Sequence, residues 1–294
     1  MRSSGMRRKA SLGICSLLLA GVGVLAQALP STAVTTPNSY VALGDSYAAG
    51  PGIPNVVHSA CQRSDHNYPS LVADARHFSS FRDASCSGAR TIDMTQSQQT
   101  NPYTFVPPQF DALGPDARLV SVTIGGNDIG FSSVVGTCVT LGLLNPFGAP
   151  CRDHYTQGGT DALAADVAAM APKIAAVLQG IHQRSPKAKV LVVGYIDILP
   201  VIGPGCWPFL PIAMGDFSYL RGVEEELNQM LASQAAGNGA TFVDTYSPTI
   251  GHDLCQDIGV RWVEGLVPTS PAAPVHPNVL GMQAAAAAVL SALH

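Results

Sequence analysis

Short apolar runs and helix-like periodicities alternate along the chain from residue 40 onward. Five segments are predicted to be strands: 40–43, 81–85, 118–124, 189–196 and 241–244, of which the run 190–193 suits a strand buried on both faces. Apolar residues recur at helical spacing in four other segments: 68–77, 161–183, 217–236 and 278–294. Strands alternating with helices predict an α/β fold whose mostly parallel five-stranded sheet is covered on both faces. Because no linker divides this region, residues 40–294 are predicted to form one domain.

The first 28 residues have the pattern of a secretory signal peptide. Basic residues precede an apolar core at 12–25, and Ala26-Gln27-Ala28 gives the small-x-small pattern of a cleavage site. A membrane anchor is the alternative, but the core is short, contains glycine and is followed by no second apolar span. Residues 29–39 are rich in Ser, Thr and Pro and predict a short flexible leader. We therefore expect the mature protein to be secreted.

Composition and charge narrow the possible functions. Only 12% of the 294 residues are charged and the net charge is −4, so a basic surface for nucleic acid is not expected. The sequence has no phosphate-cradling, zinc or haem motif. We therefore expect neither a metal nor an organic cofactor.

The cysteines fit an exported protein. Of the seven present, Cys15 lies in the signal segment, which leaves an even number in the mature chain. An even number of cysteines in an exported protein predicts disulfides, although several pairings are possible. Pairing in sequential order closes three local loops, and we expect the bridges Cys61–Cys86, Cys138–Cys151 and Cys206–Cys255. No two of these cysteines have the close spacing of zinc ligands.

Polar residues or glycines follow three of the predicted strands. Ser46, Gly88 and Asn127 each come after a strand, and ligands of parallel sheets gather at the carboxyl ends of the strands. Each is also an ordinary turn residue. A serine nucleophile needs a general base, and His276 in Pro274-Val275-His276-Pro277-Asn278 lies just before the last predicted helix. An oxyanion could be held by the backbone N–H groups of Ser46 and Gly88 and by the side-chain amide of Asn127.

These blocks, taken in order, resemble a known family. Gly44-Asp45-Ser46, then Gly88, then Gly125-Gly126-Asn127-Asp128, then His276 resemble the four blocks of the SGNH (GDSL) hydrolases. Within that superfamily the chain is most similar to secreted actinobacterial esterases and lipases with three disulfides. The resemblance implies a three-layer, flavodoxin-like α/β/α fold and a carboxylic ester hydrolase without cofactors. It implies that Ser46 is the nucleophile, His276 the base, and Gly88 and Asn127 oxyanion donors, and it supports the sequential disulfides.

One position departs from the family pattern. Members usually carry Asp three residues before the histidine, where this chain has Ala273. Some members use a backbone carbonyl instead, and we expect the Ala273 carbonyl to accept the imidazole N–H. The competing hypothesis is a carboxylate from elsewhere, namely Asp253 or Asp257.

The apolar stretches 131–160 and 199–215 bear on the class of substrate. They either line an acyl channel or pack beneath a long disulfide-closed loop, and Trp207 and Trp262 are either pocket walls or core. An acyl channel predicts a lipase or esterase for fatty acyl esters that makes transient contact with lipid surfaces and works as a monomer. The alternatives are a carbohydrate acetyl esterase of the same fold or a non-catalytic exported binding protein.

Overall fold

The computed structural model describes residues 38–294, and the predicted signal peptide lies outside them. The main sheet contains β1 (Ser39–Gly44), β4 (Ser80–Asp83), β7 (Ala117–Thr123), β8 (Lys189–Val193) and β9 (Thr241–Val243). All five predicted strands are therefore confirmed to within a few residues. β1 begins at Ser39, which the sequence had placed in the leader, because Ser39 pairs with Ser80 and Ala117 on the neighbouring strands. Residues 29–37 of the leader lie outside the described part.

The sheet is parallel throughout, with the strand order β4-β1-β7-β8-β9. In chain order these are the second, first, third, fourth and fifth strands, which is the flavodoxin-like arrangement. Gly44 pairs with Thr123, so the central strands β1 and β7 end side by side. The residues that follow them therefore meet at one edge of the sheet.

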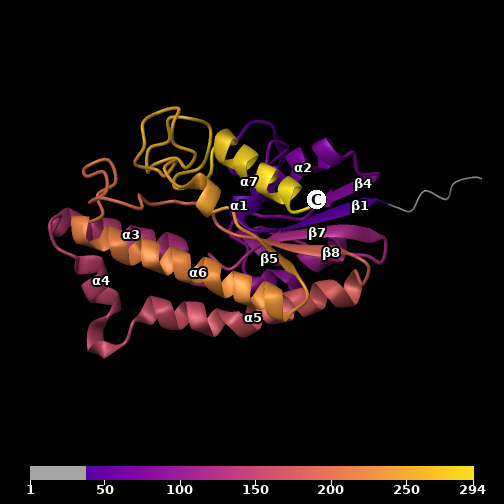
Figure 1. The fold of residues 1–294 in the computed structure, drawn as a ribbon, viewed down its shortest axis with the longest axis horizontal. Helices are drawn as coiled ribbons and strands as arrows, with labels where there is room; N and C mark the ends of the chain where they lie inside the picture. The colour runs from indigo at the N-terminus through magenta and orange to yellow at the C-terminus, as the bar shows by residue number, and fades with distance from the viewer. Residues whose placement is uncertain (1–37) are drawn as a thin grey trace, which may run out of the picture. The chain divides into compact units, whose positions relative to one another are not determined.

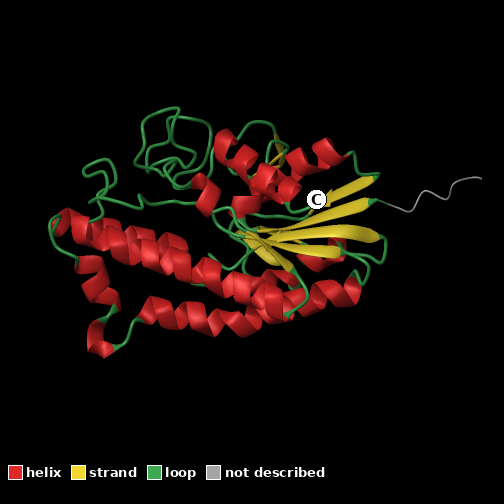
Figure 2. Ribbon diagram, viewed as in Figure 1, coloured by secondary structure: helices red, strands yellow, loops and turns green. Residues whose placement is uncertain are grey.

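Helices cover both faces of the sheet and complete three layers (Figures 1 and 2). One layer contains α5 (Ala162–Arg184) and α6 (Phe217–Gly237), and the other contains α1 (Ser46–Ala49), α2 (Tyr68–Arg76) and α7 (Val279–Ser291). Successive strand residues point to opposite faces. Val41 and Val120 accordingly pack in the core cluster of α5 and α6, whereas Tyr40 packs in the cluster of α2 and α7. Because both faces are buried, the inner strands β1 and β8 contain continuous apolar runs at 40–43 and 190–193.

The helices α5 and α7 begin at side-chain caps. The Asp161 carboxylate accepts from the N–H groups of Leu163 and Ala164 at the start of α5. The Asn278 side chain accepts from Leu280 and Gly281 at the start of α7. Such caps satisfy N–H groups that have no partner inside the helix. The cap on Asn278 fixes the place where the chain leaves the predicted base, His276.

The stretch after β7 is not the long loop that the sequence predicted. It contains α3 (Phe131–Leu144) and α4 (Pro150–Tyr155), which are joined by the Cys138–Cys151 disulfide. Apolar side chains lie on every side of α3 and glycines interrupt it, so no single apolar stripe marks the helix. The other two predicted bridges, Cys61–Cys86 and Cys206–Cys255, are also present. All three pairings are confirmed.

Two small antiparallel hairpins complete the fold and were not predicted. They are β2 (Val56–His58) with β3 (Arg63–Ser64), and β5 (Gln98–Asn101) with β6 (Thr104–Val106). Their strands are too short and too polar to show a period of two. Within residues 38–294, no helix is both long and apolar enough to cross a membrane.

Candidate active site

Ser46 is placed by the abrupt end of β1. Gly44 has φ +146°, and a Cβ there would lie 2.5 Å from the Thr123 carbonyl oxygen, so this position requires glycine. The side chain of Gln109 donates to the Gly44 carbonyl at 2.8 Å and accepts from the Gly44 N–H at 2.7 Å. Asp45 then caps α1, and Ser46 is the first residue of that helix. The serine therefore stands on a turn whose backbone is fixed on both sides.

His276 is at hydrogen-bond distance from this serine. The Ser46 hydroxyl donates to Nε2 at 2.7 Å, and Nδ1–H donates to the Pro274 carbonyl at 2.7 Å. A neutral imidazole has one donor and one acceptor nitrogen, and the carbonyl fixes which nitrogen is which. The structure thus brings together the predicted nucleophile and base across 230 positions of the sequence.

The carbonyl that orients the histidine belongs to Pro274, so the prediction of Ala273 is wrong. The cause is the backbone conformation of Val275, the residue between Pro274 and His276. Val275 has φ 59°, a left-handed conformation that is costly for a β-branched residue. It is held there by a bond from its N–H to the Glu264 carbonyl at 3.1 Å and by a bond from the Tyr47 hydroxyl to its own carbonyl at 2.9 Å. Ala273 instead donates its N–H to the Pro51 carbonyl.

No carboxylate replaces the missing aspartate. Asp253 is buried and accepts from the Cys255 N–H and the Gln256 amide, and Asp257 is exposed. In the part of the chain that the structure describes, His276 makes no hydrogen bond or ion pair with a carboxylate. Burial lowers the pKa of His276, and the Pro274 carbonyl opposes this effect. The imidazole is therefore neutral at pH 7, as a general base must be.

The predicted oxyanion donors Gly88 and Asn127 follow the strands β4 and β7, which neighbour each other across β1. The Asn127 amide donates to the Ala89 carbonyl at 2.9 Å, which orients it and leaves its second N–H available. Gly88 has φ +80°, in the left-handed region that favours glycine. Within residues 38–294, the backbone N–H groups of Ser46 and Gly88 donate to no protein atom. The Asp128 carboxylate ties the two blocks together by accepting from the N–H and hydroxyl of Thr91.

Tyr195 connects the segment that carries Ser46 to the segment that carries Asn127, and the sequence analysis missed it. Its hydroxyl donates to the Asp45 carboxylate at 2.6 Å and accepts from the Gly126 N–H at 2.7 Å. Burial raises the pKa of Asp45 to about 7, opposed by the bonds from Tyr195 and from the Tyr47 N–H. Tyr195 lies just beyond Gly194 at the end of β8, so its place at a strand end was the signal that could have revealed it.

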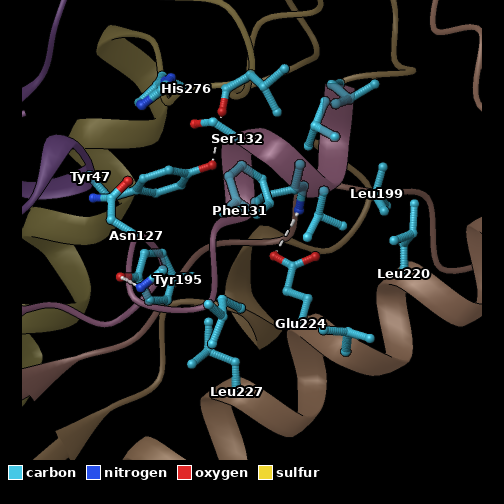
Figure 3. A pocket seen from close by; sticks show the side chains of 18 of the residues that line it. Tyr47, Asn127, Phe131, Ser132, Tyr195, Leu199, Leu220, Glu224, Leu227 and His276 are labelled. Carbon is cyan, nitrogen blue, oxygen red and sulfur yellow. Dashed lines mark hydrogen bonds between the residues drawn. The ribbon is translucent and has the colours of Figure 1, made fainter. Parts of the chain in front are cut away.

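An apolar pocket that is partly open to solvent adjoins Ser46 and His276. Figure 3 shows Tyr47, Asn127 and His276 with part of its apolar lining. The lining comes from α3, α6 and the segment after β8, including Phe131, Val134, Leu199, Leu210, Ile212 and Leu227. Both apolar stretches named from the sequence thus contribute to it. The end of α3 at Leu144 and the connection to α4 around Phe147 are exposed and do not line the pocket.

The two tryptophans do not line this pocket. Trp262 stacks on His252 with ring centroids 3.6 Å apart, and the Trp207–Pro208 peptide is cis. Among residues 38–294 there is also no group of three or more His, Cys, Asp or Glu side chains that could hold a metal. The residues at the site are those of nucleophilic attack on a carbonyl: a hydroxyl, a neutral imidazole and preorganised donors.

Known proteins are similar to this chain in sequence and in fold. Residues 42–284 match the GDSL-like lipase/acylhydrolase family. The chain is 38% identical to Lipase 2 of Streptomyces coelicolor over 288 residues, covering 94% of this chain and 95% of that protein. It is 30% identical to a lipase of Streptomyces rimosus over 244 residues, covering 80% and 81%.

Two solved structures have the same fold. Phospholipase A1 from Streptomyces albidoflavus superposes with a TM-score of 0.70 at 29% identity, covering 87% of this chain and 99% of that one. The extracellular lipase from Streptomyces rimosus superposes with a TM-score of 0.69 at 28% identity, covering 87% and 100%. The chain therefore belongs to the GDSL-like lipase/acylhydrolase family and is a carboxylic ester hydrolase.

Proposed function

We propose that this enzyme hydrolyses lipid or fatty acyl esters outside the cell through a Ser46–His276 dyad. The observation that carries the proposal is the 2.7 Å contact between the Ser46 hydroxyl and His276 Nε2 beside an apolar pocket. A nucleophile within hydrogen-bond reach of an oriented base is the requirement for covalent acyl transfer. The apolar lining supplies a place for an acyl chain.

The reaction follows from the positions of these groups. His276 Nε2 takes the proton of Ser46 as the hydroxyl oxygen attacks the ester carbonyl. The N–H groups of Ser46 and Gly88 and the amide of Asn127 stabilise the resulting oxyanion. The imidazolium gives its proton to the departing alcohol. A water activated by the same imidazole then releases the acyl group from Ser46.

The Pro274 carbonyl takes the place that an aspartate occupies in a triad. It holds Nδ1–H in the productive tautomer, which is the orienting part of the aspartate's role. It carries no full charge and so stabilises the imidazolium less. We accordingly propose a dyad, with Pro274 acting as a positioning group through its main chain.

The apolar pocket favours a lipid or fatty acyl substrate over acetylated carbohydrate. The similar proteins named above are lipases and a phospholipase A1, which supports the same preference. Secretion is supported by the signal-like N-terminal sequence, by three disulfides and by the extracellular lipase among the similar structures.

The test uses para-nitrophenyl esters from acetate to palmitate with wild type, Ser46→Ala and His276→Ala. Each variant should lose at least about 10⁴-fold in kcat, since neither half of the dyad works alone. Exposed residues of the same types, changed as Ser97→Ala and His154→Ala, are matched controls and should retain activity. Full turnover by Ser46→Ala would refute the mechanism. An optimum at acetate would favour the carbohydrate esterase alternative over a lipase.

A further inference from the structure

The apolar pocket contains one acidic side chain that the mechanism does not use. Glu224 lies on α6 and lines the pocket, and the residues one turn away on the same face of the helix are Leu220 and Leu227. Figure 3 shows its carboxyl group among Leu199, Leu220 and Leu227, away from His276. The residue is only 8% exposed. An acid in such surroundings is costly to bury and calls for a physical reason.

The carboxyl group has an unused hydrogen-bonding position. One oxygen accepts from the Ile198 N–H at 3.3 Å. The other oxygen is buried and has no partner among the described residues. Figure 3 shows this second oxygen pointing away from the Ile198 bond. A buried polar atom without a partner destabilises the protein, so a ligand that pairs with it gains affinity.

The other buried polar side chains of the pocket have partners. The Tyr47 hydroxyl donates to the Val275 carbonyl, and Asn127 donates to the Ala89 carbonyl. Tyr195 is bonded to Asp45, and Ser46 to His276. Among the residues that line this pocket, Glu224 is thus the one that carries a buried side-chain atom with no hydrogen-bond partner within residues 38–294.

The charge state of Glu224 suits an uncharged partner. Burial, reinforced by the neighbouring carboxyl of Asp197, raises its pKa well above the ordinary value. Asp197 is itself fully buried, and burial together with the Asp253 carboxylate raises its pKa to about 7. A protonated carboxyl has both a donor and an acceptor. The unpaired second oxygen can therefore either donate a hydrogen bond to a hydroxyl group or accept one from it.

We propose that Glu224 is a specificity-determining residue that binds a hydroxyl group carried part-way along the acyl chain of the ester. This inference rests on the proposed function, because it takes the apolar pocket as the acyl site. A plain alkyl chain leaves the second Glu224 oxygen unpaired, whereas a hydroxylated chain of the same length satisfies it. The enzyme accordingly selects esters of hydroxylated acyl chains over plain ones.

The test compares para-nitrophenyl dodecanoate with its monohydroxylated isomers, the hydroxyl being moved along the chain one carbon at a time. Wild type should show a kcat/KM about tenfold higher for one isomer, or a few neighbouring ones, than for plain dodecanoate, as one neutral hydrogen bond provides. Glu224→Leu should reduce that preference to about twofold or less while still cleaving dodecanoate. Glu224→Gln keeps a donor and an acceptor and should retain most of it. Glu226→Leu, an exposed change on the same helix, is the matched control and should behave as wild type.

Two results would overturn the inference. In the first, wild type shows no preference for any hydroxyl position. This result needs no variant and so does not depend on whether Glu224→Leu folds. Alternatively, Glu224→Leu would keep the full preference, which would leave Glu224 as a structural acid that holds only the Ile198 N–H. Failure of the proposed function looks different, because wild type would then cleave neither plain nor hydroxylated dodecanoate.

Discussion

Replacing Glu264 by glutamine should loosen the segment that carries His276. Glu264 is fully buried, and its side chain accepts from the Thr269 N–H at 2.8 Å and from the Asn278 amide at 2.9 Å. Its main chain bonds to Val275 on one side and to the His276 carbonyl on the other. The segment that bears the base is therefore organised around one carboxylate that does not itself touch the base.

The size of the effect follows from the donors. Hydrogen bonds to a charged group contribute about 1.5–3 kcal/mol each. Glutamine keeps one acceptor oxygen and places an NH2 group against a donor at the other position. Asn278 cannot turn to accommodate it, because its oxygen caps α7. We expect a loss of about 3 kcal/mol in the free energy of unfolding, or about 6–12 °C in Tm for a domain of this size.

The same change should alter how stability depends on pH. Bonds from Asn278, Thr269 and Ser270 outweigh the effect of burial and lower the pKa of Glu264 in the folded state. Its contribution is then fully present above the unfolded pKa of about 4.3 and is lost as the pH falls through the lower folded value. Urea unfolding from pH 7 to pH 3 should show the gap between wild type and Glu264→Gln narrowing with acid. Glu226→Gln is the exposed control. A gap under 1 kcal/mol at pH 7, or one that is constant with pH, would refute the reasoning.

Further predictions concern the chemistry. Asn127→Ala should lower kcat about 10²–10³-fold with little change in KM, because the amide acts on the oxyanion; a loss confined to KM would contradict that role. Because burial lowers the pKa of His276, kcat/KM should rise with pH along an acidic limb whose midpoint lies below about 6.5. A pH–rate profile with its midpoint above that value would indicate a carboxylate partner. Replacing both Asp253 and Asp257 by Asn should leave kcat within about threefold, as neither contacts His276; a loss near 10⁴-fold would restore the triad hypothesis.

The main sheet and its layers were predictable because its central strands are buried on both faces. Residues 190–193, for example, form a continuous apolar run that no polar alternation obscures. The helix at 131–144 was not predictable in this way, since apolar residues surround it and part of its surface lines a pocket rather than the core. From the sequence alone, an apolar side chain that lines a cavity cannot be distinguished from one that packs in the core.

Glu224 shows the same limit at a single residue. Beside Arg221, Glu225 and Glu226 it belongs to what looks like a solvated charged face. Its spacing of four from Leu220 and three from Leu227 places it on the apolar stripe instead. Charge and periodicity therefore disagree at this position, and periodicity was right. Such disagreements mark places where a fold departs from its own local rules, and these tend to be functional sites.

The sequence could predict that a backbone carbonyl orients His276 but not which carbonyl, because Val275 adopts a left-handed backbone conformation. This β-branched residue at φ 59° is held by a bond to Glu264, earlier in the same loop region, and by a bond from Tyr47, in a distant part of the sequence. That same turn carries the Pro274 carbonyl to Nδ1 and the ring to Ser46. With a carbonyl there, the imidazole loses the charge partner that would raise its pKa, and burial lowers the pKa further. In the proposed dyad the base is therefore deprotonated at neutral pH but is a weaker proton acceptor, which leaves more of the barrier to be lowered by the proposed oxyanion donors that follow the neighbouring strands.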